Sequence, residues 1–330
     1  MENKKIVNTE DIKQKARQLG FDLVGITSAG PLDAEQIRIY QDWVDSGLAA
    51  GMDYMKKKIS ERFNPAALLG AAQSVIVTAI NYKPSQDSLD NKNSFAVRHL
   101  SETGRVACYA QYEDYHVFIK KLLLKLTDFI ASIAGPDIKF KICVDSAPLA
   151  ERAFAVRAGL GFIGRNHLLI NPHLGPQLLL GEIITTLKLQ GDEPLSADCG
   201  SCRKCIGACP TGALREDGKL DAGRCISYLT VEHKTDIPCD LAALMGNHIF
   251  GCDECILCCP YQQKSPYCKN KDFRFFSERG NLDLNEILKM NEESFARRFC
   301  DSPLLRTGLV RLQRNAAICL ENLTTGRAES

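Results

Sequence analysis

The sequence predicts a mixed fold, α+β or α/β, in three parts: a layered α/β domain over residues 1–190, a cysteine-rich part over residues 191–270 and a helical C-terminal segment over residues 271–330. As far as residue 190, segments with helical periodicity alternate with short apolar runs typical of strands, which is the pattern of a layered domain. Beyond it, polar turns and cysteines replace that pattern, and helical periodicity returns at residue 282. A chain of 330 residues can build an ordinary hydrophobic core outside the cysteine-rich part.

Four helices are expected in the layered domain, over residues 10–19, 34–47, 112–134 and 148–157. Thr9 is the predicted N-cap of the first helix, and Gly20 is its stop. Pro148 is expected to open the fourth helix, because a proline in the first turn loses no hydrogen bond. The long third helix is expected to point five apolar side chains inward: Val117, Leu122, Leu124, Phe129 and Ile133.

Four strands are expected in the same domain, over residues 21–27, 74–80, 138–144 and 178–189, although one sequence does not fix their order. Asp145 directly follows the third strand, and strand ends of α/β folds collect ligands and catalytic groups. Taken alone, Asp145 is as well explained as a cap of the helix that follows. His116 stands near a helix start and is expected to be structural.

The glycine-rich segment 159–164 matches a dinucleotide-binding fingerprint only by its letters. It follows a helix, whereas the fingerprint requires a preceding strand, so a nucleotide loop is not expected. We expect these glycines to let the backbone pass close to a large flat ligand.

The composition is that of an ordinary soluble globular protein, with 45% hydrophobic and 25% charged residues and a net charge of +1. No apolar run approaches the roughly 20 residues of a membrane span. The first ten residues lack a signal-peptide pattern, so a cytoplasmic protein with reduced thiols is expected. Two local basic runs stand out: residues 56–58, and residues 294–314, which hold five arginines against Asp301. Either run is equally well explained as a solvated helix face.

Eight of the 15 cysteines follow the spacing of a ferredoxin that carries two [4Fe–4S] clusters. Gaps of two residues let three thiolates converge on one cluster, and the cysteine before a proline ligates the other cluster. The predicted ligand sets are Cys199, Cys202, Cys205 and Cys259 for the first cluster, and Cys209, Cys225, Cys252 and Cys255 for the second.

Two alternatives stay open at this point. Cys258 also completes a run of cysteines at two-residue gaps and competes with Cys225 for the second cluster. Pairs of cysteines at this spacing also build zinc sites, but a zinc ribbon would use two pairs and leave the other cysteines idle.

Several segments together resemble the epoxyqueuosine reductase family, and they extend over nearly the whole chain. The resemblance rests on residues 51–55, 62–65, 109–116, 144–170, 178–183, 225–232 and 246–255, with Cys259-Pro260 and the first cysteine run. It implies a cytosolic enzyme that binds cobalamin and two [4Fe–4S] clusters, with Cys225 as a cluster ligand. The implied reaction reduces epoxyqueuosine to queuosine at the wobble position of tRNA.

The resemblance also assigns roles to individual residues. Asp145 is expected to be the proton donor beside cobalt. The corrinoid is expected to be surrounded by Arg62, Ala150, Arg152, Leu169, Leu180, Ser227 and Asp253. Cys108 stands where related chains often carry arginine, so a corrinoid contact at that position is not carried over.

Reduction of an epoxide to an alkene takes two electrons and two protons and releases water. Asp145 can supply a proton near neutral pH only if an apolar environment raises its pKa. The expected partners are the anticodon stem-loop of tRNA, held through the arginines of residues 297–314, and an external electron donor such as a flavodoxin or a ferredoxin. The alternatives are a reductive dehalogenase-like enzyme acting on a small molecule and a ferredoxin-type electron-transfer protein.

Overall fold

The computed structural model of the chain describes residues 7–85 and 102–326. Its larger sheet has the strand order β1-β2-β7-β4, and all three pairings are antiparallel. The strands are β1 (Leu23–Ser28), β2 (Ser74–Asn81), β4 (Phe140–Cys143) and β7 (Leu178–Thr185). The mixed fold is confirmed, and the antiparallel pairing makes its sheet an α+β arrangement.

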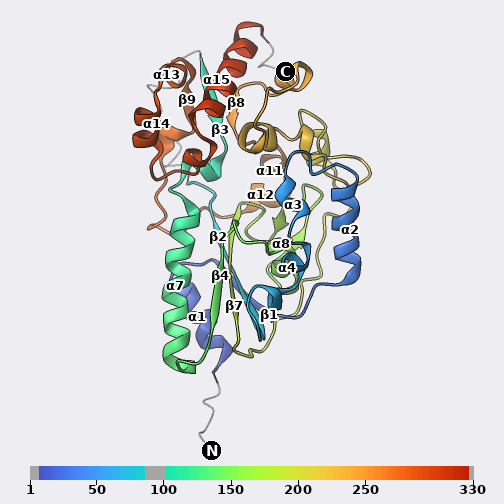
Figure 1. The fold of residues 1–330 in the computed structure, drawn as a ribbon, viewed down its shortest axis with the longest axis vertical. Helices are drawn as coiled ribbons and strands as arrows, with labels where there is room; N and C mark the ends of the chain where they lie inside the picture. Colours follow the sequence, from blue (N-terminus) through green and yellow to red (C-terminus); the bar gives the residue numbers. More distant parts are fainter. Residues whose placement is uncertain (1–6, 86–101, 327–330) are drawn as a thin grey trace, which may run out of the picture.

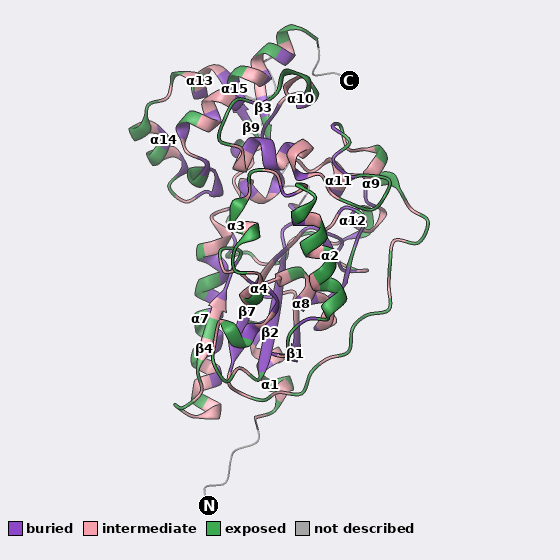
Figure 2. Ribbon diagram, turned by 45° about the vertical axis from the view of Figure 1, so that its right-hand side comes forward, coloured by how far each residue is buried: buried purple, intermediate pink, exposed green. Residues whose placement is uncertain are grey.

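Helices cover both faces of the larger sheet (Figure 1). On one face lie α1 (Thr9–Gln18) and α7 (Tyr115–Ala134), which pack with Ile76 and Ile183 of the strands in one buried cluster. On the other face, α2 (Ala34–Asp45) and α8 (Glu151–Arg157) pack with Val77 and Ile184 in a second cluster. Strand β2 is buried along its whole length, as Figure 2 shows. The sheet is therefore the rigid centre on which the neighbouring loops are mounted.

Two helix predictions were wrong in detail. The N-cap of α1 is Asn8, whose side chain accepts the backbone N–H of Glu10 at 3.0 Å, whereas Thr9 is already helical. In α7, Val117 is 65% exposed and Leu124 is 48% exposed, so neither points inward. The predicted face was wrong because apolar residues occur nearly all round this helix. The residues that α7 does bury are Phe118, Ile119, Leu122, Leu123, Leu126, Thr127 and Ile130.

The helix after β4 begins later than expected. α8 starts at Glu151 with Ala150 as its N-cap, and Pro148 lies before it in an irregular turn. Asp145 opens that turn with a φ of 55°, in the left-handed region that non-glycine residues rarely adopt. The turn displaces the helix start by three residues and presents Asp145 at the end of β4.

A second sheet, of order β8-β3-β9, joins segments from all three predicted parts of the chain. β3 (Thr103–Val106) pairs in parallel with β8 (His248–Phe250) and in antiparallel with β9 (Asn281–Asp283). Helices α13 (Leu284–Lys289), α14 (Glu292–Phe299) and α15 (Leu309–Thr324) contribute to the core beside this sheet. The C-terminal helices are confirmed, and the division at residues 190 and 270 stays a prediction.

The remaining elements are short. A hairpin of β5 (Phe162–Ile163) and β6 (Leu169–Ile170) follows α8. A Cβ on Gly161 would lie 2.3 Å from the carbonyl oxygen of Ile170, so this glycine admits neighbouring backbone and not a ligand. The short helices are α3 (Asp53–Lys56), α4 (Ile59–Phe63), α9 (Lys204–Gly207), α10 (Cys239–Leu244), α11 (Glu254–Leu257) and α12 (Pro260–Lys264), with a π-helical turn at Tyr228–Glu232.

Candidate functional site

The side chain of Asp145 contacts a histidine of helix α7. Its Oδ2 lies 3.1 Å from Nε2 of His116, in the first turn of α7. The other ring nitrogen, Nδ1, lies 2.7 Å from Oδ1 of Asp114, which also caps α7 by accepting the backbone N–H of His116. Because both ring nitrogens face carboxylate oxygens, the arrangement favours the protonated ring, in which both nitrogens are N–H donors. Asp145, His116 and Asp114 therefore form one hydrogen-bonded chain.

The two ends of this chain differ in their contact with solvent. The side chain of Asp145 is 61% exposed, whereas that of His116 is 10% exposed. At the far end, Arg306 Nε lies 3.5 Å from Oδ2 of Asp114 and balances its charge. A proton on His116 can thus reach solvent or a ligand through the exposed carboxyl group of Asp145.

The charges in this chain shift the pKa values in opposite directions. The hydrogen bond from His116 lowers the pKa of Asp145, against the smaller opposing effect of burial. Burial by itself would lower the pKa of His116, but its hydrogen bonds to Asp114 and Asp145 outweigh that effect and raise it. The expectation of an apolar site that raises the pKa of Asp145 was therefore wrong, because an imidazolium stands beside the carboxylate.

The sequence offered a separate interpretation for each residue: a helix cap for Asp145 and a structural role for His116. Asp145 does not cap α8, whose N-cap residue is Ala150. His116 was expected to be structural, and in this structure its Nε2 lies at hydrogen-bond distance from Asp145. Sequence reasoning missed the pair because 29 residues separate its members. The available signal was Asp114-Tyr115-His116, where an N-cap aspartate precedes the histidine by two positions.

Five of the residues expected around the corrinoid come from segments near the Asp145 turn. The N–H of Ala150 donates to the carbonyl oxygen of Arg62 at 2.8 Å, and Arg152 donates to the carbonyl oxygen of His167. Leu169 belongs to the buried cluster under α8, and Ala150 and Leu180 pack against that cluster. The Nε of Arg62 is buried and has no hydrogen-bond partner among the described residues.

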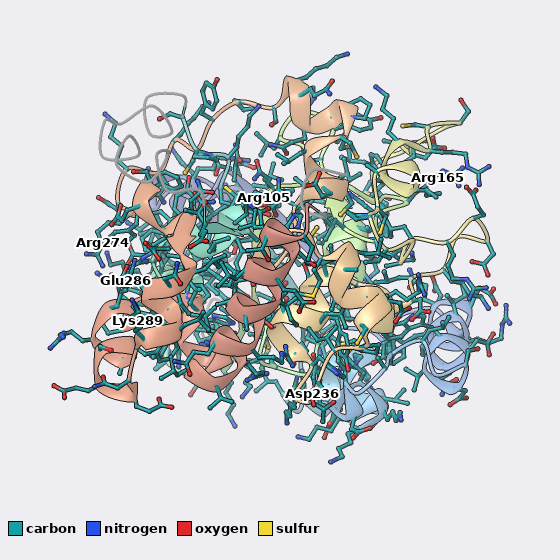
Figure 3. The ribbon with its side chains drawn as sticks, turned by 90° about the horizontal axis from the view of Figure 1, so that it is seen from above. Arg105, Arg165, Asp236, Arg274, Glu286 and Lys289 are labelled. Atoms are coloured by element: carbon teal, nitrogen blue, oxygen red, sulfur yellow. The ribbon has the colours of Figure 1, made fainter. Side chains whose placement is uncertain are left out.

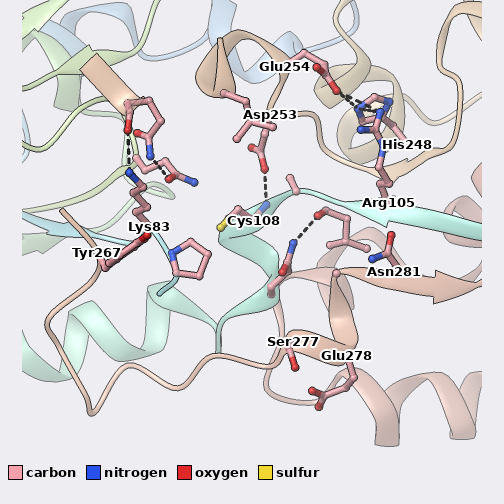
Figure 4. Close-up of a pocket in the computed structure, with 18 of the residues that line it drawn as sticks. Lys83, Arg105, Cys108, His248, Asp253, Glu254, Tyr267, Ser277, Glu278 and Asn281 are labelled. Carbon is pink, nitrogen blue, oxygen red and sulfur yellow. Dashed lines mark hydrogen bonds and ion pairs between the residues drawn. The ribbon is translucent and has the colours of Figure 1, made fainter. Parts of the chain in front are cut away.

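The other two residues lie in the cysteine-rich part. Ser227 lies two positions after Cys225 and interacts with its thiol. Asp253 accepts the backbone N–H of Cys108 at 2.6 Å, and burial raises the pKa of Asp253 to about 6. Both Asp253 and Cys108 line a cavity of about 530 Å³, which Figure 4 shows between Lys83 and Arg105. The charges of Asp253 and Asp145 both raise the pKa of Tyr109, so both groups lie within electrostatic range of its hydroxyl group.

All four cysteines of the first predicted set line one cavity of about 400 Å³: Cys199, Cys202, Cys205 and Cys259. Cys258 is not among the lining residues, although it is close enough to Cys259 and Cys202 to feel their charges. Three basic side chains, Arg165, Lys204 and Lys264, line the same cavity and are exposed. Figure 3 shows Arg165 projecting away from the ribbon on this side of the molecule.

The cysteines of the second predicted set also lie within electrostatic reach of one another. Cys225 feels the charge of Cys209, and Cys255 feels those of Cys252 and Cys225. Burial raises the pKa of Cys252 to about 12. Metal loading must therefore displace protons from buried thiols. The N–H of Ala213 already donates to the sulfur of Cys209 at 3.2 Å, the kind of contact that tunes a cluster's potential.

Two arginines of the segment expected to bind tRNA form hydrogen bonds within the protein. Arg311 donates to the carbonyl oxygens of Val231 and Thr307, at 2.8 and 2.6 Å. Arg314 donates to those of Leu229 and His233, at 2.7 and 2.9 Å. The expectation that these two arginines contact phosphates stays a prediction, although their guanidinium groups already donate to backbone oxygens of the π-helical turn, of its flank and of Thr307.

No helix in residues 7–85 and 102–326 is long and apolar enough to span a membrane. Within the same ranges, no group of three or more His, Cys, Asp or Glu side chains is arranged to hold a single metal ion.

Two family models match this chain. Residues 62–146 match "Epoxyqueuosine reductase QueG, DUF1730", and residues 198–262 match the "4Fe-4S double cluster binding domain". The second match agrees with the two four-iron clusters that the cysteine spacing predicts, and the zinc alternative is not supported.

Three similar proteins carry the same name. An epoxyqueuosine reductase of Pseudomonas aeruginosa is 38% identical over 314 residues, covering 95% of this chain and 85% of that protein. A crystal structure of epoxyqueuosine reductase with an epoxyqueuosine-modified stem loop of tRNA-Tyr is 31% identical with a TM-score of 0.86, covering 97% of this chain and 82% of that one. The Bacillus subtilis enzyme, 29% identical with a TM-score of 0.86 and the same two coverages, was solved with its catalytic aspartate loop swung out of the active site.

Proposed function

This chain belongs to the epoxyqueuosine reductase family, and we propose that it reduces epoxyqueuosine to queuosine in tRNA, with Asp145 and His116 as its proton-delivering pair. The observation that carries the proposal is the 38% identity to an epoxyqueuosine reductase over 95% of the chain. The reaction consumes two electrons and two protons, breaks both C–O bonds of the epoxide, forms a C=C bond and releases the oxygen as water. The small-molecule and plain electron-transfer alternatives are not favoured.

The residues near Asp145 fit a large ligand with many amide groups, as cobalamin is. The buried Nε of Arg62 has no partner within the described residues and would donate to a ligand carbonyl oxygen. The apolar side chains of Leu169 and Leu180 would pack against a flat ring, with Ala150, Arg152, Ser227 and Asp253 at its edge. Cobalamin, when bound, supplies a strong nucleophile that can store reducing equivalents; the residues of this chain bind it and deliver the protons.

Proton delivery follows from the hydrogen-bonded chain. An opened epoxide develops negative charge on oxygen, and an acid beside it lowers the barrier. His116 holds the proton because two carboxylates face its ring, and Asp145 is the exposed end of the chain. Asp145, a carboxylate beside the imidazolium, accepts the proton from Nε2 of His116 and then passes it to the substrate oxygen. Asp114 then stabilises the ring in the orientation needed for reprotonation.

We assign the cluster ligands as the sequence predicts. The first set is Cys199, Cys202, Cys205 and Cys259, and the shared cavity supports it. The second set is Cys209, Cys225, Cys252 and Cys255, and their mutual electrostatic interaction supports it. Cys205 and Cys255 interact as well, so the two sets are neighbours and electrons can pass between them. The three-part division at residues 190 and 270 and a cytoplasmic location complete the proposal.

Electrons are expected to enter at the first cluster. Its cavity opens beside three exposed basic side chains, Arg165, Lys204 and Lys264, which suit an acidic redox protein such as a flavodoxin or a ferredoxin. Replacing all three with glutamine should lower the rate of reduction by flavodoxin and weaken its salt dependence. Reduction by dithionite, a small chemical reductant, should stay unchanged.

The phosphate contacts of tRNA are better sought at residues 56–58 than at Arg311 and Arg314. All three lysines of that run are exposed, and the ion pairs of Lys56 and Lys58 are loose, at 3.4 and 3.9 Å. The run follows Tyr54, which feels the charge of Asp145. Replacing Lys56, Lys57 and Lys58 with alanine should flatten the salt dependence of tRNA binding by a log–log slope of about 0.7 per lost contact.

The test of the function uses tRNA from cells that lack the activity. The purified protein, reconstituted anaerobically with iron, sulfide and cobalamin, should convert epoxyqueuosine to queuosine when a reductant is present. Nucleoside mass spectrometry follows the loss of one oxygen atom. Failure of the loaded wild-type enzyme on this tRNA, with both clusters present by absorption, would overturn the proposal.

A further inference from the structure

A fully buried glutamate lies in the middle of the larger sheet. Glu182 of β7 is 0% exposed and pairs in register with Val77 of β2 and Cys143 of β4. Residues two apart on a strand share a face, so its side chain points the same way as those of Leu180 and Ile184. Those residues lie in or against the apolar cluster under α8. A negative charge in such surroundings is strongly unfavourable.

Glu182 has its strongest polar interaction with another carboxyl group. Neither of its carboxyl oxygens receives a hydrogen bond from a donor in the described part of the chain. The carboxyl group of Glu151, in the first turn of α8, interacts with the carboxyl group of Glu182. Two carboxylates cannot bond to each other, whereas a carboxylic acid and a carboxylate can. The pair therefore holds one proton between two carboxyl groups.

Glu151 also forms a hydrogen bond with the turn that contains Asp145. Its Oε1 accepts the backbone N–H of Asp145 at 2.5 Å. That residue has a φ of 55°, a conformation that costs free energy for a non-glycine residue and persists only where surrounding contacts enforce it. The bond to Glu151 is such a contact. It leaves the carboxylate of Asp145 free to meet His116.

We propose that Glu151 is a positioning residue: the Glu151–Glu182 pair, holding one shared proton, keeps the Asp145 turn in the conformation in which Asp145 contacts His116. The inference rests on the proposed role of Asp145. Loss of the shared proton would leave two carboxylates in contact in an apolar site, beside the charge of Asp145. Their repulsion would push Glu151 away and release the turn.

Other charged and titratable groups bear on this pair. Burial is the main reason that the pKa of Glu151 rises to about 7 and that of Glu182 rises well above its ordinary value, and the charge of Asp145 adds to both shifts. The interaction between the two glutamates raises the pKa of Glu182 and lowers that of Glu151. Arg152 opposes the shift at Glu151. The groups that face the pair and the turn are Asp145, Cys143, Arg152, His116, Tyr115 and Arg306.

The test compares three variants by hydrogen exchange of residues 145–150 in the isolated protein, corrected for the intrinsic effect of pH. In the wild type, exchange should increase as pH rises through the range in which the pair loses its proton. Glu182→Gln donates an amide N–H to Glu151 at every pH, so exchange should stay low and independent of pH. Glu151→Ala removes the acceptor, so exchange should be high throughout. Glu151→Gln keeps an acceptor oxygen and should rescue protection.

Turnover provides the second readout. Glu151→Ala should lower kcat by about 10²-fold, the effect of a misplaced catalytic group, with the KM for tRNA unchanged. Asp137→Asn, an exposed carboxylate just before β4, is the matched control and should behave as wild type in both measurements. A wild-type exchange profile in both Glu182→Gln and Glu151→Ala would overturn the inference. Full activity of Asp145→Asn would instead overturn the proposed function and leave the exchange result standing.

Discussion

The Asp145 site and the cysteine-rich part are organised by different forces. The Asp145 site stands on a sheet with a fully buried central strand and on two helices, and its polar groups are already hydrogen-bonded to one another. Around the first set of cysteines, the buried apolar cluster is only Phe162, Ile170 and Cys259. Packing therefore preforms the contact between Asp145 and His116, whereas metal binding must supply much of the order around the first set of cysteines.

Loss of a cluster ligand should have the largest effect and should separate the two regions. Cys209→Ser and Cys255→Ser should each reduce the iron content from about eight to about four per chain, because we assign both to one four-iron cluster. Turnover should then be lost, since electrons no longer reach the site. The secondary structure of the larger sheet, followed by circular dichroism, should persist.

The matched control for these variants is Cys258→Ser, which lies beside the first set but outside its cavity. We expect it to keep all its iron and nearly all its activity. A loss of four irons in Cys258→Ser, with Cys225→Ser unaffected, would show that Cys258 is the ligand and Cys225 is not.

Asp145→Asn tests the preformed region directly and should have the next largest effect. The asparagine keeps the size of the side chain and cannot deliver a proton, so turnover should fall by about 10² to 10⁴-fold. Iron content and cobalamin binding, both measured by absorption, should match the wild type. Activity within a few-fold of the wild type would exclude Asp145 as the proton-delivering group.

The pH dependence of turnover should report His116. Its pKa is raised above the ordinary 6.5, so the proton is present at and below that pH and is lost as pH rises through the higher folded value. Turnover should therefore fall by about tenfold per pH unit beyond that folded pKa. The stabilisation that protonated His116 gives the fold is lost over the same rise in pH.

The pH dependence of stability has the opposite sign for Asp145. Its pKa is lowered, so the stabilisation that its carboxylate gives is lost only as pH falls below the ordinary 3.8.

Measuring the pH profile in a Glu182→Gln background removes the overlapping titration of the Glu151–Glu182 pair. In that background, His116→Gln should have lower activity than the parent variant. Its remaining turnover should no longer fall as pH rises. An alkaline fall that survives His116→Gln would assign it to another group.

The smallest effect on turnover should come from the core beneath the site. Ile119→Ala removes a fully buried side chain of α7 and should cost about 2–5 kcal/mol of unfolding free energy. Val117→Ala, on the exposed face of the same helix, should change it by less than about 0.5 kcal/mol. Activity per folded molecule should be unchanged in both. Equal losses of stability in urea titrations would contradict the burial pattern of α7.

Some of these features were predictable from local sequence. The four strands of the larger sheet lie within a few residues of their predicted ranges, because each is a short apolar run bounded by turn residues. The cluster-binding region was predictable because iron–sulfur ligands need close, regular spacing along the chain. The buried face of α7 was not, since nearly every position of that helix is apolar and periodicity gives no unique phase.

Sequence by itself thus determined the mixed fold, the cysteine spacing and the family of this chain. Tertiary structure alone decided which polar groups meet: Asp145 with His116 across 29 positions, Glu182 with Glu151 across the face of the sheet, and Arg311 and Arg314 with backbone carbonyls about 80 positions away. Strand order and helix phase set those contacts, and a hydrophobic pattern contains neither. The state of each proton depends on them, because a carboxyl group's pKa is fixed by the charge that folding places beside it.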